Sequence, residues 1–508
     1  MKSFFLALML GLSIVACAQN KIVGTVLDQQ NKPISGATIR FPELHKETLS
    51  DENGTYNFRN LPKGSFKITF SYIGFETQTK SIEIAQKEAV MNVVLIETMH
   101  QMDEVIISTA FNKLQSQNVM KVEHQSIKSL SQKGTSTLIE GLATIPGVAQ
   151  VSTGTSIGKP VIRGLSGNRV LVYSQGVRLE NQQFGEEHGL GLNDAGIESV
   201  EVIKGPASLL YGSDAIGGVL YFNPEKFAMP NTVEGNFSQK FFSNTNGSHS
   251  SLGVKASSDK LKFLARGSYN THADYKIPDE NRVTNTRYNE SDFKTALGYS
   301  NDHFTSTLRY NFNKLDLGIP ENGIAEQTSI KKTTFPKQAV FANILSLNNT
   351  IFFKNSKLDA DLGYISNDRS EFENSDVSNL HMKLKTYNYN VKYYLPKLGN
   401  FESIIGTQGM HQTNANSGED YLIPDATTND FGVFTTVNYE WKKNVLQAGV
   451  RFDNRNIVSI EHGVLGEEGY FQAMDKKFQS FNASMGLKTN LKQNLIFRLN
   501  FATGFRAP

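Results

Sequence analysis

The sequence lacks long apolar runs, because after its N-terminus no stretch reaches the roughly 20 residues that a membrane-spanning helix needs. Only 39% of the 508 residues are hydrophobic and 20% are charged, with a mean hydropathy of −0.34. This composition excludes a helical membrane protein. It leaves a transmembrane β-barrel open, because barrel strands alternate apolar and polar residues. The length predicts several domains.

The sequence also has little cysteine and little net charge. Cys17 is the only cysteine, so cleavage after Ala18 would leave a mature protein without thiol or disulfide. The net charge of +2 gives no indication of nucleic-acid binding. Tryptophan occurs once, whereas the 33 Phe and 18 Tyr are numerous enough for the aromatic girdles of a barrel or for ordinary cores.

Sequence patterns of catalysis are also missing. There is no Gly-x-Ser-x-Gly elbow, no His-Glu-x-x-His helix and no cysteine pair, and the ten histidines are scattered. The glycine-rich stretch from Gly212 to Gly218 lacks the Gly-Lys-Ser/Thr ending of a phosphate-binding loop. The sequence therefore predicts a protein that is not an enzyme and requires no cofactor.

The N-terminus predicts export. Lys2 precedes an apolar run from Phe4 to Ala16, and small residues around Cys17 come before Gln19. This order of features is typical of a cleaved secretory signal peptide, here residues 1–18. The run that ends at Cys17 also fits a lipoprotein box, so lipidation of Cys17 is the alternative.

Residues 121–228 combine short apolar runs with glycine-rich turns. Val170–Val172 and Val200–Ile203 fit buried strands, and Ser208–Tyr211 can form one helical turn. These blocks alone would also fit an ordinary α+β domain. Their order along the chain resembles the plug domain of TonB-dependent outer-membrane receptors. The resemblance implies a structural or gating role for Arg163, Gly164, Arg169, Gly205, Pro206, Tyr211, Gly212, Gly217 and Gly218.

Residues 19–97 contain short alternating runs separated by turn residues, which predicts a small β-sandwich. Asp51–Gly54 lacks the ligand series of a calcium loop, so we expect a hairpin turn built on Asn53 and Gly54. The unit resembles the carboxypeptidase-regulatory-like domain, which is not catalytic and which often precedes the plug in receptors of this type.

Residues 98–120 join the sandwich to the plug. The run Asp103, Glu104, Val105, Ile106, Ile107 and Ser108 resembles a TonB box, the segment that the energy-transducing protein TonB grips in the periplasm. An extended, β-branched run suits such a role, because it offers backbone groups to the edge of a partner's sheet. A last sandwich strand or a plain linker is the alternative. Residues 110–120 are expected to be polar linker.

Residues 229–508 consist of alternating segments broken by polar turns, such as Leu261–Tyr269 and Tyr387–Tyr393. Segments of about 9–11 residues with this alternation predict transmembrane β-strands, and a soluble sandwich is the alternative. We expect an all-β-dominated protein with a sandwich, an α+β plug and an antiparallel barrel. About 11–12 strands are recognisable where plugged transporters have 22, so we expect a chain truncated at its C-terminus.

The resemblance implies gated transport across the outer membrane. A small extracellular ligand would bind between the plug and the barrel loops. TonB, with the inner-membrane energising complex, would then remodel the plug by means of the proton gradient. The barrel itself would contact outer-membrane lipid.

The loop that contains Glu186, Glu187 and His188 carries the clearest indication of cargo. Carboxylate and imidazole ligands suit Zn²⁺ or another first-row metal, and the placement is similar to an acidic–His pair in zinc-uptake receptors of this family. A solvated loop or a salt bridge to a barrel arginine is the equally weighted alternative. Candidate additional ligands are Glu371, Glu373, His381, His411, Glu419 and Asp420.

We therefore expect a receptor for a metal ion or small metal complex, with Zn²⁺, Cu²⁺ or a haem or iron complex as transported ligand. One alternative is a receptor for a ferric siderophore or an oligosaccharide. Another is a surface protein that transports nothing and uses its sandwich and plug for adhesion.

Overall fold

The computed structural model describes residues 20–507 apart from 45, 73, 86–87, 98–103, 181–184, 186, 205–207, 322, 468 and 493–494. Some predicted features therefore lie outside the described residues: the signal peptide with Cys17, and the site residues Asp103, Glu186, Gly205 and Pro206.

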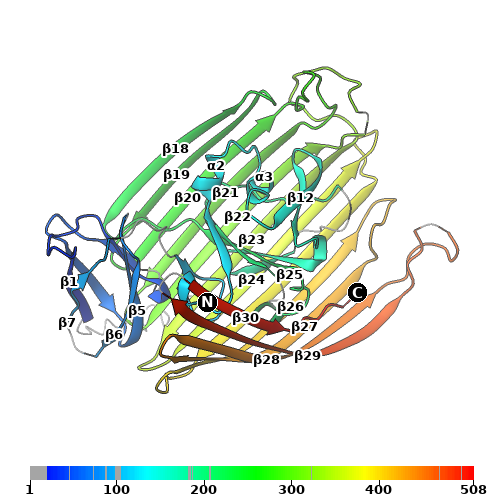
Figure 1. Ribbon diagram of the computed structural model, residues 1–508. Coiled ribbons are helices and arrows are strands. Elements are labelled where there is room, and N and C mark those ends of the chain that lie inside the picture. The colour runs from blue at the N-terminus through cyan, green and yellow to red at the C-terminus, as the bar shows by residue number, and fades with distance from the viewer. Residues whose placement is uncertain are drawn as a thin grey trace, which may run out of the picture.

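The largest element is a 13-stranded antiparallel sheet in which every strand pairs with the next along the chain (Figure 1). Its strands are β18 Thr232–Phe242, β19 Gly247–Ser257, β20 Leu261–His272, β21 Tyr288–Ser300, β22 Phe304–Gly318, β23 Lys337–Phe352, β24 Lys357–Phe372, β25 Leu380–Tyr394, β26 Phe401–Asn416, β27 Ala426–Trp441, β28 Asn444–Ser459, β29 Met474–Lys492 and β30 Leu495–Ala502. The expected 11–12 strands were too few. Strands such as β19 carry so many Ser and Gly residues that their alternation is weak in the sequence.

The two faces of this sheet differ in polarity, as a transmembrane barrel wall requires. Apolar side chains such as Phe237, Phe241 and Leu261 are exposed on the outer face, whereas Ser251 and Arg266 are buried on the inner face. No helix among the described residues is long and apolar enough to cross a membrane.

The connections between the barrel strands divide the sheet into two rims. One rim, named the short-turn rim, carries 258–260, 301–303, 353–356, 395–400 and 442–443. The other, named the long-loop rim, carries 273–287, 319–336, 373–379, 417–425 and 460–473. This difference in length is typical of outer-membrane barrels, which have short periplasmic turns and longer extracellular loops.

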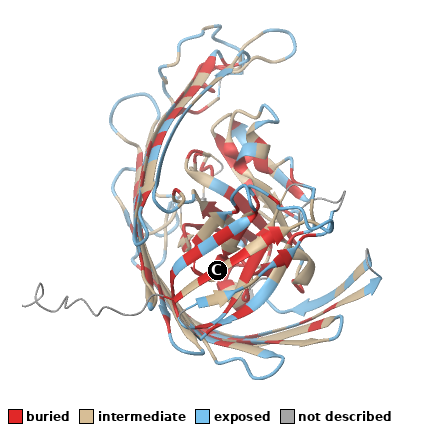
Figure 2. Ribbon diagram, turned by 90° about the vertical axis from the view of Figure 1, so that its left-hand side faces the viewer, coloured by how far each residue is buried: buried red, intermediate tan, exposed pale blue. Residues whose placement is uncertain are grey.

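The plug lies in the concave side of the barrel sheet (Figure 2). Its main sheet has the order β11-β16-β17-β14-β15, and β12 and β13 form a separate hairpin. Within the described part of this plug sheet, β14 and β17 pair in parallel and the other neighbouring strands pair in antiparallel fashion. The elements are β11 Val122–Ser126, α2 Ile127–Ser131, α3 Leu138–Leu142, β12 Val148–Gly154, β13 Ile157–Ile162, η3 Gly167–Arg169, β14 Val170–Ser174, β15 Val177–Leu179, β16 Ile197–Lys204, α4 Ser208–Tyr211 and β17 Gly218–Pro224. The expected strands around 171 and 201 and the helical turn at 208–211 are confirmed.

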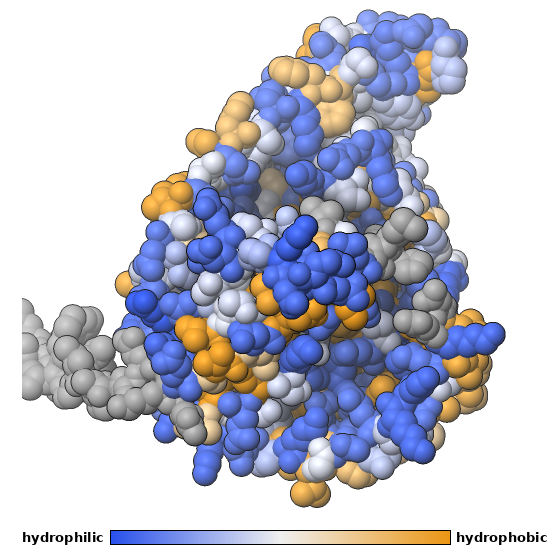
Figure 3. Space-filling view, turned by 60° about the vertical axis from the view of Figure 1, so that its left-hand side comes forward, coloured by the Kyte–Doolittle hydropathy of each residue, from blue (hydrophilic) through white to orange (hydrophobic). Residues whose placement is uncertain are grey.

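The N-terminal sandwich packs against the short-turn rim (Figure 1). One sheet contains β4-β1-β7 with β8, and the other has the order β3-β2-β5-β6. Phe66 of the sandwich meets Phe352 of the barrel, with ring centroids 5.7 Å apart. On this side of the molecule hydrophilic side chains predominate and apolar ones form separate patches (Figure 3). The elements are β1 Asn20–Leu27, β2 Thr38–Phe41, η1 Pro42–Leu44, β3 Lys46–Leu49, β4 Thr55–Leu61, β5 Gly64–Ser71, β6 Gln78–Ile84, β7 Glu88–Val90 and β8 Val93–Val94.

One detail of the sandwich differs from expectation. The Asn53-Gly54 segment is a turn in which the amides of Asn53 and Thr55 donate to Asp51 Oδ1 at 2.9 and 2.8 Å. It does not close a hairpin, because β3 pairs with β2 whereas β4 pairs with β1. The turn instead carries the chain from one sheet of the sandwich to the other.

Candidate functional site

The described part of the box segment, residues 104–108, is docked against the plug. β9 (Val105–Ile106) pairs with β10 (Lys113–Leu114) in antiparallel register. Ile106 is fully buried in a cluster that includes Val122 and Ile203 of the plug sheet. The backbone of this segment is thus occupied by the plug, whereas strand addition to a partner would require free backbone groups.

The segment that follows, expected to be polar linker, packs into the barrel instead. Phe111 lies against Ile404 and Phe434 of the wall. Lys113 is buried, lies 2.8 Å from Glu402 of β26 and also pairs with Glu440 of β27. η2 (Gln115–Gln117) completes this stretch. A lysine in a polar stretch can therefore fix its segment to the barrel wall when carboxylates on the wall strands face it.

Buried ion pairs fasten the plug to the barrel wall. Asp214, next to α4, accepts from Arg178 of β15 at 3.0 Å and from Arg455 of β28 at 2.8 Å. Arg455 also contacts Asp430 of β27 at 2.7 Å. Burial alone would raise the pKa of Asp214, but the two arginines hold that pKa below its usual value. The carboxylate therefore stays ionised and keeps plug and wall together.

A cavity beside these ion pairs lies between the plug and the wall. Its free volume is about 30 Å³, enough for one or two waters. The Nε2 atom of Gln408 on β26 donates to the hydroxyl of Tyr173 at 3.0 Å across this interface. Other side chains that line the cavity are Arg178, Tyr211, Asp430 and Arg451. At this cavity the contact between plug and wall is therefore polar, whereas elsewhere Ile344 and Ile365 of the wall pack into the apolar core of the plug.

The plug glycines for which a structural or gating role is expected differ in how much space surrounds them. A Cβ on Gly217 would lie 2.7 Å from the carbonyl oxygen of Arg169, and one on Gly218 only 2.2 Å from that of Ile203. A Cβ on Gly212 would lie 2.8 Å from Arg451 of the wall. Gly164, in contrast, has a φ of +82° with nothing within 4 Å. Tyr211 is buried, whereas Arg163 and Arg169 are exposed.

Gly218→Ala is expected to destabilise the plug much more than Gly164→Ala. Both positions have positive φ, which costs a non-glycine residue roughly 1–3 kcal/mol. Only Gly218 adds a clash with backbone, at about 1–3 kcal/mol more for overpacking. Thermal unfolding of the two variants, compared with the unchanged receptor, measures the difference. Equal losses would mean that the space at Gly218 is irrelevant.

The plug loop suspected of metal binding contacts the barrel through Glu187 and His188. The Nε2 atom of buried His188 lies 2.6 Å from Glu371 Oε1 on β24. Gln338 of β23 donates to the same carboxylate oxygen at 3.0 Å and to the Glu187 carbonyl at 3.3 Å. His188 is thus paired with a barrel carboxylate, whereas Glu186, a partner that a barrel arginine could bind, lies outside the described residues.

The other candidate ligands do not converge on His188. His411 contacts Asn429 at 2.7 Å, and His381 contacts Asp368 at 2.8 Å. His411 is exposed on β26 and alternates with Gln408 and Met410, which face the cavity. Glu373, Glu419 and Asp420 lie exposed in long loops. Across the described ranges, no group of three or more His, Cys, Asp or Glu residues is placed to hold a metal ion.

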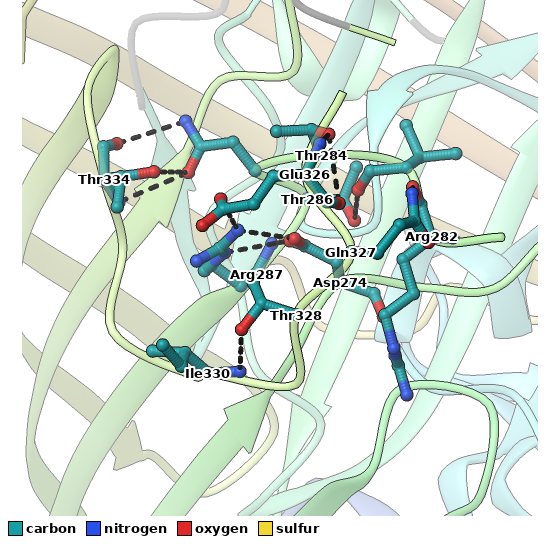
Figure 4. Close-up of polar contacts among 12 residues, drawn as sticks. Asp274, Arg282, Thr284, Thr286, Arg287, Glu326, Gln327, Thr328, Ile330 and Thr334 are labelled. Atoms are coloured by element: carbon teal, nitrogen blue, oxygen red, sulfur yellow. Dashed lines mark hydrogen bonds and ion pairs between the residues drawn. The ribbon is translucent and has the colours of Figure 1, made fainter. Parts of the chain in front are cut away.

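Hydrogen bonds join two long loops at the long-loop rim, which forms the mouth of the barrel (Figure 4). Arg287 donates to Asp274 at 2.6 Å within loop 273–287 and to Glu326 of loop 319–336 at 2.9 Å. The plug hairpin reaches the same place, because Ile157 packs with Tyr288 and Ile319. The mouth is therefore bounded by plug and loops together, as ligand capture at this rim would require.

Three family models match the chain in sequence order. The "CarboxypepD_reg-like domain" covers residues 22–107, and the "TonB-dependent Receptor Plug Domain" covers 115–219. The "TonB dependent receptor-like, beta-barrel" model covers 226–508, more than half of the chain. The order sandwich, plug and barrel is thus recognised independently of the coordinates.

Curated relatives are receptors and transporters. "TonB-dependent receptor P39" of Formosa agariphila is 25% identical over 211 residues, which are 40% of this chain and 19% of that protein. "Vitamin B12 transporter BtuB" of Vibrio vulnificus is 32% identical over 165 residues, or 31% of this chain and 25% of the relative. "Heme/hemopexin utilization protein C" of Haemophilus influenzae is 42% identical over 99 residues, or 19% and 14% of the two chains. The matched parts span a quarter or less of each relative.

Solved structures share the fold. "Copper transporter OprC" superposes with a TM-score of 0.65 at 17% identity, over 76% of this chain and 63% of that one. The "FrpB iron transporter from Neisseria meningitidis" superposes with a TM-score of 0.63 at 15% identity, over 76% and 64%. At these identities the likeness concerns architecture alone.

Proposed function

Because the chain belongs to the family of TonB-dependent receptors, whose barrels lie in the outer membrane, we propose that it binds a scarce nutrient at the cell surface and imports it into the periplasm. Binding takes place at the long-loop rim. TonB grips the box segment at the opposite side, and the proton gradient of the inner membrane supplies the energy through the energising complex.

One observation carries this proposal: the box segment and the barrel wall hold the same plug sheet. Glu201 of β16 binds the amides of Ile107 and Ser108, and Tyr173 of β14 binds Gln408 of the wall. A pull on the box therefore acts directly on the structure that fills the barrel. Such a connection suits a gated transporter and has no use in a surface protein that only adheres.

We further propose that the cargo is a metal ion or a small metal complex, with Zn²⁺, Cu²⁺ or a haem or iron complex as the candidates. Support comes from His188, whose imidazole is paired with the Glu371 carboxylate where the plug meets the wall. These are donor types that Zn²⁺ and Cu²⁺ accept. Glu186 and Glu187 directly precede His188 along the chain and would supply further oxygen ligands.

Loss of the His188 imidazole is expected to weaken Zn²⁺ binding about tenfold or more, since even indirect ligand partners contribute that much. Calorimetric titration of the purified full-length receptor with Zn²⁺ compares His188→Ala with the unchanged protein. The matched control is His303→Ala, which alters an exposed histidine at the short-turn rim. Equal affinity in all three proteins would exclude His188 as a ligand.

Growth identifies the cargo independently of that titration. A strain that lacks the receptor is complemented with the full-length gene and grown on limiting zinc, copper or haem. Growth that is restored on one of these nutrient sources identifies that nutrient as the cargo. Restored growth only on a ferric siderophore or an oligosaccharide would contradict the metal proposal and leave import by this receptor intact.

A further inference from the structure

Glu201 is a fully buried carboxylate, and within the part of the chain that the structure describes its hydrogen bonds come from neutral donors. It lies in the middle of β16, in the otherwise apolar run Val200-Glu201-Val202. Oε2 accepts the amides of Ile107 at 3.0 Å and Ser108 at 2.7 Å, and Oε1 accepts Asn223 Nδ2 at 2.8 Å. A buried charge is tolerated only while such donors surround it, and the box segment supplies two of these three donor groups.

The side chains around Glu201 form one row across four strands of the plug. The strand registers place His124 of β11 opposite Glu201, Glu201 opposite Tyr221 of β17, and Tyr221 opposite Tyr173 of β14. Directly paired residues project from the same face of a sheet. This face receives the box segment, and the His124 Nδ1 atom lies 2.5 Å from the Glu104 carboxylate.

A second group holds the same box residue from its other side. The hydroxyl of Tyr211, in α4, donates to the carbonyl oxygen of Ser108 at 2.5 Å. The Tyr211 ring packs edge-on against Tyr173, with centroids 4.8 Å apart. Ser108 is therefore held at its N–H by β16 and at its C=O by α4, so neither group is free to pair with an incoming strand.

Docking and strand addition compete for the same backbone. A partner that adds a strand needs the N–H and C=O groups of the box, and undocking strips Glu201 of two amide donors at once. Because an uncompensated buried charge is costly, the box leaves only when the Glu201 site opens to water. The contact is thus suited to hold the segment either fully docked or fully released.

The far end of the row reaches the cavity between plug and wall. Tyr173 and Tyr211 both line this cavity, together with Arg178 and Arg451. The Tyr173 hydroxyl also accepts the hydrogen bond from Gln408 of β26. A shift of the plug against the wall therefore acts on the rings that position the Tyr211 hydroxyl over Ser108.

From this arrangement we propose that Glu201 is the positioning residue of a latch. The latch consists of His124, Glu201, Tyr173, Tyr211 and Tyr221, and it keeps residues 104–108 docked until the plug moves. The inference rests on the proposed function in one respect, the assignment of these residues as the segment that TonB grips.

Hydrogen exchange of the full-length receptor tests the latch without a ligand or a partner. Glu201→Gln removes the charge but keeps the size of the side chain, and Tyr211→Phe removes only the hydroxyl. Both are expected to speed exchange of the Ile107 and Ser108 amides about tenfold or more, as loss of charge-assisted or buried hydrogen bonds does. The matched control is Glu198→Gln, which alters an exposed carboxylate on the same strand and should leave these amides protected.

Two exchange results would overturn the latch. One is unchanged protection of residues 107 and 108 in both variants. The other is faster exchange throughout the plug sheet, because Glu201 would then be a general structural residue. Capture of the receptor on an immobilised periplasmic domain of TonB is measured separately. Faster local exchange with no gain in capture supports the latch and overturns the box assignment, whereas a gain in both supports the two together.

Discussion

Energised uptake is expected to fall on the order of a hundredfold or more when Val105 is replaced by proline, with ligand binding retained. Proline has no N–H and a fixed φ, so it interrupts the hydrogen-bond ladder that an added strand needs. Val105 is half-buried in β9, which pairs with β10, and Lys113 of β10 contacts Glu402 and Glu440 beside the short-turn rim. The mouth at the opposite rim therefore stays intact. Accumulation of the identified cargo in energised cells measures uptake, and binding to de-energised cells measures capture.

The control for this experiment is Val105→Ala, which keeps the backbone N–H and removes only methyl groups. We expect its uptake to stay within a few-fold of the unchanged receptor. If proline at 105 leaves uptake untouched, residues 104–108 are not the segment that TonB grips. If proline abolishes capture as well as uptake, the substitution has disturbed the plug. Hydrogen exchange at the amides that bind Glu201 checks this disturbance independently.

The fold could be predicted from the sequence because its features are local and repeated. Alternation of apolar and polar residues marks β20 and β25 directly, and Ser208–Tyr211 forms the expected helical turn between β16 and β17. Strands with weak alternation escaped recognition. β19 presents Leu252 and Val254 outward, but its remaining positions are mainly small or polar residues, so nothing local distinguishes it from a loop.

The site was harder to predict, because its contacts join residues that are far apart in the chain. Ser108 meets Glu201 across 93 positions, and Arg455 meets Asp214 across 241. No spacing rule connects such pairs. One signal was present nevertheless: a glutamate inside an apolar strand must find buried donors, and Glu201 marks such a place. The same reasoning applies to Asp214, which stands beside the glycine turn after α4.

The loop that contains Glu187 and His188 shows what sequence patterns leave undetermined. The pattern Glu186-Glu187-His188 fits a ligand pair and a salt bridge equally, and only the fold decides which groups face it. Glu371 faces His188, whereas His411 lies on the exposed face of β26. The carboxylate at 371 serves as a hydrogen-bond partner here and would become a ligand if a metal displaced the imidazole proton.

Arg455→Ala is expected to loosen the plug in the barrel. Arg455 is buried and bonds to Ser213 and Asp214 of the plug and to Asp430 of the wall. Removing it takes a cation from buried Asp214 and from partly buried Asp430, a change worth about 3–5 kcal/mol and hence roughly a hundredfold or more in the population of a detached plug. Sensitivity of cells to a large antibiotic that the outer membrane excludes should rise accordingly.

Arg455→Lys separates charge from geometry in this prediction. Lysine keeps the cation but cannot bridge both carboxylates with a planar fork, so its effect should lie between those of alanine and arginine. Arg59→Ala, at an exposed position of the sandwich, controls for loss of a positive charge and should leave sensitivity unchanged. If alanine at 455 causes no leak, Arg178 alone suffices to hold Asp214, and the ion pairs orient the plug without fastening it. If the alanine variant becomes sensitive to the antibiotic and the lysine variant does not, the positive charge at position 455 holds the plug in place and the planar guanidinium is not needed.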